Sequence, residues 1–203
     1  MIKFVYFDLG GVVILDFSKT NKYQQMKDTI GVSVEQGQRF DNWFDEKENL
    51  LNLGKESLDL NFENINLTLA DFVNRFEINK SIWPVIDEIR RHCRVGLLTN
   101  MYPGMFEAIK KREIIPDINW DIIIDSSVEK IAKPDPMIYQ LAEERADVKG
   151  DQILFVENTP GHIKAAQTFG WQTFLYDPAH PESSSNNLLA FFHLAPKQRP
   201  KYS

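Results

Sequence analysis

The stretch FVYFDLGGVVILD, residues 4–16, decides how this chain begins to fold. Its first residues are β-branched and aromatic, the run ends at Asp8, and a pair of glycines follows. A short apolar run that is closed by Gly-Gly is typical of a buried strand followed by a tight loop. We therefore expect a strand over residues 2–7 with an acidic side chain directly after it.

The same pattern recurs along the chain. Apolar runs closed by polar residues follow at RVGLLTN (94–100), DIIIDSS (121–127) and QILFVENTPG (152–161), and a last apolar run, QTFLY, covers 172–176. Amphipathic helical patterns occupy about residues 82–92, 103–113, 136–146 and 160–169. Strands that alternate with helices indicate a parallel sheet, in which ligands bind at the carboxyl ends of the strands. The polar residues at these ends are expected to face one crevice: Asp8, Thr99, Asn100, Glu157 and Asn158.

Residues 16–80 interrupt this alternation, because they are far too many for one connection from a strand to a helix. Their apolar residues recur at spacings of three and four, which predicts helices over 18–29, 33–50 and 55–76. We expect a small helical insertion over the crevice, with Trp43, Phe44 and Phe72 packed inside it. Near the other end of the chain, residues 178–187 are expected to form a linker, and residues 188–194 a short apolar segment that docks on the core.

The composition excludes several classes of partner and compartment. A chain of 203 residues is long enough for one domain with a small insertion, and a net charge of -6 gives no reason to expect nucleic acid or membrane as a partner. The single cysteine, Cys93, forms no internal disulfide, which favours a reducing compartment and hence the cytoplasm. The apolar run before Asp8 is too short for a signal peptide or a membrane span. The sequence does not indicate an oligomeric state.

Four motifs occur in a fixed order along the chain: FDLGGV (7–12), LLTN (97–100), KPDP (133–136) and ILFVENTPGHIKAAQTFGW (153–171). By these motifs the chain resembles the haloacid dehalogenase-like hydrolases over nearly its whole length. The resemblance implies an α/β fold with a Rossmann-like parallel sheet core, formed by residues 1–15 and 81–203. It also implies a helical cap inserted after the first motif, which corresponds to residues 16–80.

The resemblance further implies a phosphohydrolase that forms an aspartyl-phosphate. To move a phosphoryl group onto a carboxylate, two anions must come together, so the site needs a divalent cation and a fixed ammonium group. In this interpretation Asp8 is the nucleophile and Lys133 is the counter-charge. The phosphate is bound by Thr99, Asn100 and Lys133, with Asn100 acting mainly as a neighbour that orients. The implied ligands of Mg²⁺ are Asp8, the backbone carbonyl of Gly10, Glu157 and Asn158.

Each of these residues also has a purely structural interpretation. Asp8 could simply end a strand, Thr99 could cap a helix, and Lys133 could be a solvated charge in a loop. Asp135 and Pro136 make a good helix start whatever Lys133 does. His162, in the first turn of a predicted helix, is expected to be a surface residue.

Two positions depart from the phosphatases of the family. Those enzymes usually carry a second Asp two residues after the nucleophile, which protonates the leaving alcohol and later activates water, and this chain has Gly10 there. They also carry a pair of acids where this chain has Glu157 and Asn158. General acid-base help is worth about 10² to 10⁴ in rate, and its loss matters least when the leaving group is acidic. We therefore expect a slow or selective phosphatase of a small phosphorylated metabolite. The DLGxV form resembles a branch that includes sugar-1-phosphate phosphatases.

Two other classes of protein stay open. A binding or regulatory protein could keep the fold and the phosphate pocket without useful turnover, and the departures at Gly10 and Asn158 support that alternative. A haloacid dehalogenase uses the same nucleophile without a metal. Its pattern, however, lacks an acid corresponding to Glu157 and normally has an aromatic residue in place of Gly10.

Overall fold

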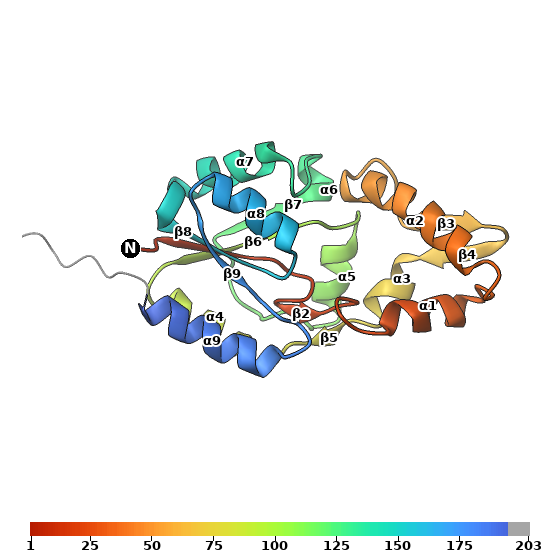
Figure 1. The fold of residues 1–203 in the computed structure, drawn as a ribbon, viewed down its shortest axis with the longest axis horizontal. Helices are drawn as coiled ribbons and strands as arrows, with labels where there is room; N and C mark the ends of the chain where they lie inside the picture. Colours follow the sequence, from red (N-terminus) through yellow and green to blue (C-terminus); the bar gives the residue numbers. More distant parts are fainter. Residues whose placement is uncertain (195–203) are drawn as a thin grey trace, which may run out of the picture.

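A five-stranded parallel sheet forms the centre of the molecule, in the order β7-β6-β1-β8-β9 (Figure 1). The computed structural model describes residues 1–194 of the chain. The strands of the sheet are β1 (Phe4–Phe7), β6 (Arg94–Thr99), β7 (Ile122–Asp125), β8 (Ile153–Glu157) and β9 (Gln172–Leu175). All four pairs of neighbouring strands run parallel, so their carboxyl ends lie along one edge. The predicted α/β class is confirmed.

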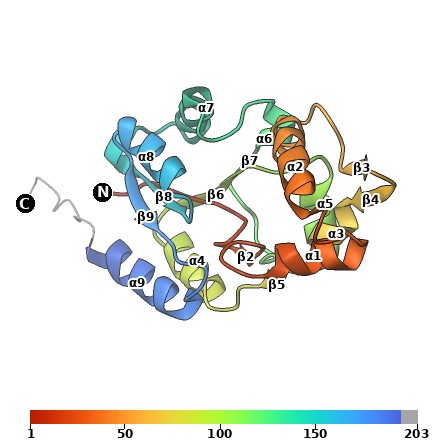
Figure 2. The ribbon, with the colours of Figure 1, turned by 45° about the vertical axis from the view of Figure 1, so that its right-hand side comes forward.

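Strand β1 is apolar throughout because both of its faces are covered. Phe4 and Tyr6 belong to one core cluster, and Val5 and Phe7 belong to the other. Helices α7 (Pro136–Ala146) and α8 (Pro160–Thr168) lie on one face of the sheet, and α4 (Trp83–Arg90) and α9 (Pro181–Leu194) lie on the other (Figures 1 and 2). A strand buried on both faces needs an apolar residue at every position, which explains why the run before Asp8 shows no alternation.

Shorter helices complete this part of the chain: α5 (Met105–Lys111), α6 (Ser126–Glu129) and the 3-10 turn η1 (Gly150–Gln152). Helix α7 starts as predicted, with Pro136 in its first turn and the Asp135 side chain accepting the Met137 N–H at 2.9 Å. In the part of the chain that the structure describes, we find no helix both long and apolar enough to cross a membrane.

Residues 16–80 form a separate layer beyond the carboxyl ends of the strands, on the right of Figure 1. Two short strands, β2 (Ile14–Leu15) and β5 (Glu77–Ile78), pair antiparallel where the chain leaves and re-enters the sheet region. The layer holds α1 (Lys22–Ile30), α2 (Gly37–Asn52), the hairpin of β3 (Asp59–Phe62) and β4 (Ile65–Thr68), and α3 (Leu69–Val73).

The helix predicted over residues 55–76 is therefore wrong. This segment is mostly a hairpin, and only its end is a short helix. The turn residues Glu63 and Asn64 both have positive φ, at 47° and 69°. A two-residue loop of this kind matches the twist of a β-hairpin, and Asn is one of the residues that tolerates it. The apolar residues whose spacing suggested a helix, Leu69, Phe72, Val73 and Phe76, lie in or just after the short helix α3.

The linker predicted over residues 178–187 is also wrong, because α9 already begins at Pro181. Two of the serines that suggested a linker, Ser184 and Ser185, are buried and hydrogen-bonded. The Ser185 hydroxyl lies 2.8 Å from the Tyr176 hydroxyl, and Ser184 Oγ donates to the Asp177 carbonyl at 3.2 Å. The predicted docking of the following apolar segment is confirmed within the described residues, since Leu188 is fully buried in the core.

Candidate active site

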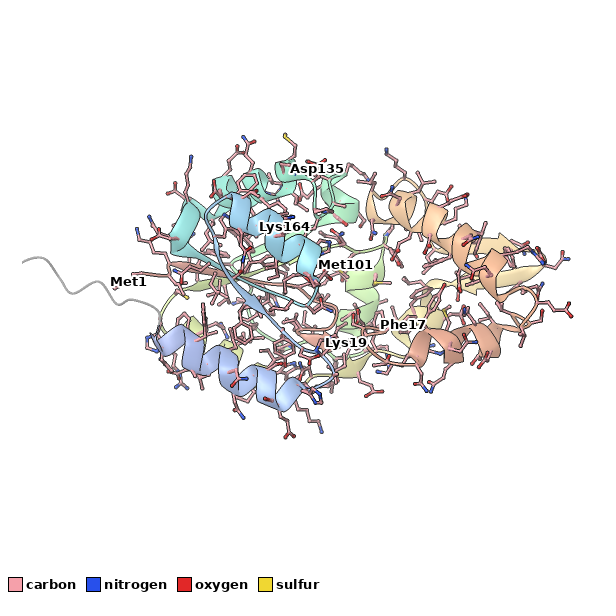
Figure 3. The ribbon with its side chains drawn as sticks, viewed as in Figure 1. Met1, Phe17, Lys19, Met101, Asp135 and Lys164 are labelled. Carbon is pink, nitrogen blue, oxygen red and sulfur yellow. The ribbon has the colours of Figure 1, made fainter. Side chains whose placement is uncertain are left out.

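A cavity of about 710 Å³ opens at the carboxyl ends of the strands, between the sheet and the layer of residues 16–80. Figure 3 shows Phe17 and Met101 in this region, one from each side. The sheet side contributes the polar residues Asp8, Thr99, Asn100, Lys133, Asn158 and His162. The opposite side contributes aromatic and acidic residues, among them Tyr23, Phe44, Asp45, Glu48 and Phe72. The cavity thus combines polar side chains at the sheet with aromatic and acidic side chains on the opposite side.

Four charged or titratable side chains at the floor of the cavity contact one another. Lys133 Nζ lies 2.9 Å from Asp8 Oδ1 and 2.7 Å from Glu157 Oε2. His162 Nδ1 lies 3.0 Å from the same Glu157 oxygen. The Lys133 side chain is 1% exposed, so its ammonium depends on the two carboxylates for compensation. We call Asp8, Lys133, Glu157 and His162 the charge cluster.

The charge cluster separates the pKa values of its two carboxyl groups. Burial and the nearby Glu157 carboxylate raise the pKa of Asp8 to about 7, against the opposing effect of Lys133. Burial alone would also raise the pKa of Glu157, but Lys133 and His162 lower it below its ordinary value. Burial would lower the pKa of Lys133, yet the two carboxylates raise it. Glu157 and Lys133 therefore stay charged near neutral pH, whereas Asp8 titrates there.

Glu157, expected as a metal ligand, uses both of its carboxylate oxygens in hydrogen bonds within the protein. Its Oε1 accepts the backbone N–H groups of Asn158 and Thr159, each at 2.8 Å, and its Oε2 faces Lys133 and His162. The residue is completely buried and is absent from the lining of the cavity. Four donors already occupy its two oxygens, so the geometry favours Glu157 as a residue that positions Lys133.

Asn100 holds the backbone of Lys133 with both ends of its amide. Its Nδ2 donates to the Lys133 carbonyl at 2.9 Å, and its Oδ1 accepts the Lys133 N–H at 2.8 Å. The Asn100 side chain therefore fixes the backbone of Lys133. Thr99 is 1% exposed and lines the cavity, and its Oγ1 lies 3.5 Å from the Asn100 carbonyl, which is too long for a strong bond. That hydroxyl can donate to an anion in the cavity.

Asp8, Gly10 and Asn158 bring oxygen atoms that fit Mg²⁺ better than other common metals. Asp8 Oδ1 accepts the Leu9 N–H at 2.8 Å and faces Lys133, while Oδ2 has no hydrogen bond within residues 1–194. Asn158 lies over Gly11, where a Cβ would come 2.9 Å from the Asn158 Cγ and where φ is +73°. The second glycine of the pair thus makes room for Asn158. Residues 1–194 contain no group of three or more His, Cys, Asp or Glu residues that could hold a metal, so the fit depends on neutral oxygens.

Two residues of the site were not expected from the sequence. His162, interpreted as a surface residue, has a side chain only 17% exposed and contacts Glu157. Asp16 lines the cavity, and burial raises the pKa of its carboxyl, with the hydrogen bonds from Ser18 opposing the shift. A signal for Asp16 was available, because it is an acid that directly follows an apolar run, as Asp8 does.

A protein-family model and a curated protein both match this chain. A family model described as haloacid dehalogenase-like hydrolase matches residues 2–170. Among curated proteins, mouse acyl-CoA dehydrogenase family member 10 is 28% identical over 126 residues. That match covers 58% of this chain but only 12% of the mouse protein, so the chain corresponds to a small part of its relative.

Solved structures with the same fold include a HAD family enzyme and a haloacid dehalogenase. A HAD family enzyme from Bacteroides thetaiotaomicron, in complex with magnesium and inorganic phosphate, has a TM-score of 0.68 and 19% identity. The match covers 88% of this chain and 96% of that one. A 2-haloacid dehalogenase from Pseudomonas syringae pv. tomato has a TM-score of 0.58 and 18% identity, over 87% of this chain and 86% of that one. At such identities the likeness shows the fold alone.

Proposed function

The chain belongs to the haloacid dehalogenase-like hydrolases, and from that premise we propose that it hydrolyses a small phosphorylated metabolite through an aspartyl-phosphate on Asp8. The observation that carries the proposal is the pairing of Asp8 with a buried ammonium at the floor of the cavity. Lys133 Nζ lies 2.9 Å from Asp8 Oδ1, where it can compensate the charge of an incoming phosphate. Asp8 Oδ2 has no hydrogen bond within residues 1–194 and is the oxygen that attacks.

The reaction has two steps. In the first, Asp8 Oδ2 attacks phosphorus, the bond from phosphorus to the ester oxygen breaks, and the leaving oxygen takes up a proton. In the second, a water oxygen attacks phosphorus and loses a proton, the bond to Asp8 breaks, and inorganic phosphate leaves. Thr99 Oγ1 and Lys133 Nζ hold phosphoryl oxygens in both steps. Glu157 and Asn100 act indirectly, because each fixes a different end of Lys133.

We assign Mg²⁺ as the cofactor, held by Asp8, the Gly10 carbonyl and the Asn158 side-chain oxygen. The ion supplies positive charge that lets two anions approach. The magnesium and phosphate in the related enzyme from B. thetaiotaomicron support this assignment. With one carboxylate among the three protein ligands, binding is expected to be weak, and much of the coordination is left to water and substrate.

Residues 16–80 act in this proposal as a cap that closes over the bound substrate. Their aromatic and acidic side chains form the part of the cavity away from Asp8, so they set which organic group fits. A polyhydroxylated group such as a sugar can donate hydrogen bonds to Asp45 and Glu48. We therefore keep sugar 1-phosphates as the first candidates, in line with the DLGxV form of the first motif.

A second candidate function is phosphate-ligand binding without useful turnover. The observation that favours it is that Glu157 is fully occupied by Lys133, His162 and two backbone N–H groups, which leaves the metal site with a single carboxylate. A protein of this kind would bind phosphate esters in the same cavity and release them unchanged.

Phosphate release from a panel of metabolite phosphates tests the proposal. The panel holds glucose 1-phosphate, acetyl phosphate and simple alkyl phosphates, each assayed with Mg²⁺ or with a chelator. We expect Mg²⁺-dependent release that Asp8→Asn abolishes. Tight ester binding without release would favour the binding protein. Chloride release from a 2-chloroalkanoate that is insensitive to chelator would instead identify a dehalogenase.

A further inference from the structure

The space beside Gly10 is occupied. A Cβ built on Gly10 would lie 3.2 Å from the Cγ of Asp16 and closer still to Oδ2, well inside van der Waals contact. Gly10 does not have a positive φ, so its backbone could carry another residue. What excludes a side chain at position 10 is therefore the carboxylate of Asp16. This carboxylate sits where the side chain of residue 10 would begin.

Asp16 reaches this place because the chain turns back on itself directly after Gly10. The N–H groups of Val13 and Ile14 both donate to the Leu9 carbonyl at 3.0 Å, and Gly10 and Ile14 form a bridge. Strand β2 then pairs with β5, which fixes the direction in which the chain leaves the turn. The turn and the strand pairing thus return residue 16 to the side of residue 10.

The Asp16 side chain is held by hydrogen bonds from Ser18. Its Oδ1 accepts the Ser18 N–H at 2.8 Å, and no hydrogen bond or salt bridge to Oδ2 is found among the described residues. Lys22, whose positive charge lowers the pKa of Asp16, is used elsewhere, because its Nζ lies 2.9 Å from Glu77 and donates to the Leu15 carbonyl. Gly10 and Asp16 both line the cavity that contains Asp8. The unpaired oxygen of Asp16 is thus available to a ligand there.

From this arrangement we propose that Asp16 is a catalytic residue, which contacts the reacting oxygens in place of the carboxylate that Gly10 lacks. The proposal rests on the aspartyl-phosphate mechanism above. As the bond from phosphorus to the ester oxygen breaks, the proton of the Asp16 carboxyl passes to the leaving oxygen, which departs as an alcohol. The resulting carboxylate then takes a proton from the water that attacks phosphorus, and the carboxyl group is restored.

Exchanging the residues at positions 10 and 16 tests whether the Asp16 carboxylate takes the place of a side chain at position 10. Asp16→Ala removes the carboxylate, and Gly10→Asp alone forces a side chain into occupied space. We expect each single variant to lower kcat/KM on an alkyl phosphate by about 10²-fold or more, which is the lower part of the range for a general acid. In the double variant G10D/D16A the space is free and a carboxylate is present again. It should recover at least about tenfold over Asp16→Ala.

The dependence of kcat/KM on the leaving group distinguishes a catalytic role of Asp16 from a purely structural one. Asp16→Asn keeps the shape of the side chain, and we expect it to lower kcat/KM on an alkyl phosphate by about 10²-fold but on acetyl phosphate by less than about threefold, since an acetate leaving group needs no proton. The comparison uses kcat/KM, which reports the transfer to Asp8, because the later attack of water is common to both substrates. Asp45→Asn removes the same charge from the same cavity. It should change the rates on both substrates by a similar factor, so that their ratio stays within about twofold. Thermal melting of each variant checks the fold.

The outcomes separate the two proposals. Equal losses on both substrates in Asp16→Asn, or no recovery in a folded double variant, would overturn the role of Asp16 while the loss of activity in Asp8→Asn still supported the phosphatase. If the wild type releases phosphate from neither substrate with Mg²⁺, both proposals fall together.

Discussion

The two sides of the cavity floor use their carboxylates in opposite ways. In the charge cluster, Glu157 has no oxygen left for a ligand, because Lys133, His162 and two backbone N–H groups occupy both. Beside Gly10, the carboxylate of Asp16 accepts the Ser18 N–H at Oδ1, and no hydrogen bond to Oδ2 is found within the described residues. Charges that bind one another maintain a structure, whereas a charge with a free oxygen is available for chemistry. Changes at Lys133 and Glu157 should therefore cost stability as well as rate, whereas a change at Asp16 should cost mainly rate.

The largest effect is expected at Lys133. Lys133→Met leaves the carboxylates of Asp8 and Glu157 buried without a cation, and breaking a buried ion pair in this way typically costs about 3 to 5 kcal/mol. Urea denaturation should show this loss in the free energy of unfolding. Lys164→Met, an exposed position on α8, is the matched control and should change stability by less than about 0.5 kcal/mol. A Lys133→Met protein as stable as its control would mean that the cluster does not hold the site together.

Substitutions at Glu157 and at Asp16 compare the two sides of the cavity floor directly. Glu157→Gln removes the charge opposite Lys133 and replaces an acceptor with a donor, so we expect a loss of about 2 to 3 kcal/mol in the free energy of unfolding. Asp16→Asn keeps the bond from Ser18 and should cost less than about 1 kcal/mol while it slows the reaction. Both values come from the same denaturation series. The contrast between the two sides is wrong if the stability losses are equal.

The pH dependence of stability isolates Asp8. Its pKa of about 7 in the folded protein lies above the ordinary value of 3.8, so the folded state binds the proton more tightly than the unfolded state does. The contribution of Asp8 to stability therefore falls as pH rises between these two values and is constant above them. In chelator, the free energy of unfolding of the wild type should fall relative to Asp8→Asn by about 2 kcal/mol between pH 5 and pH 7. Parallel curves for the two proteins would contradict the raised pKa.

The smallest effect is expected at the metal. Asn158→Asp adds a second carboxylate to the ligands proposed for Mg²⁺ without changing the shape of the side chain. The Mg²⁺ concentration for half-maximal activity should fall by about tenfold, or about 1.4 kcal/mol in binding free energy. Titration of activity with Mg²⁺ measures it. An unchanged half-saturation would remove Asn158 from the ligand set.

The sheet and most of its site were predictable because the signals are local. Apolar runs closed by Asp8 or by Thr99 and Asn100 mark strand ends, and parallel pairing brings such ends to one edge. The hairpin at β3 and β4 was missed although Glu63 and Asn64 carry a local turn signal. It was overlooked because the apolar residues that follow it, Leu69, Phe72 and Val73, have helical spacing, and the predicted helix was extended back over the hairpin.

The roles of Asp16 and Glu157 could not be predicted, because contacts between distant residues decide them. Asp16 returns to Gly10 only through the turn at Leu9 and the pairing of β2 with β5, which lies more than sixty residues further along the chain. One oxygen of Glu157 binds the ammonium group of Lys133, which precedes it by 24 residues. Residue spacing alone does not show whether a carboxylate is paired with a cation. It also does not show whether another side chain fills the space beside a glycine.

The most direct test of the central claim is to trap the phosphoryl group on Asp8. The protein is mixed with acetyl phosphate and Mg²⁺, quenched in acid and digested, and the peptide that contains residues 4–16 is analysed by mass spectrometry. We predict one added phosphoryl group on Asp8 in the wild type, removed by hydroxylamine and absent from Asp8→Asn. Steady release of phosphate by an Asp8→Asn protein, with no phosphorylated peptide in the wild type, would contradict the account.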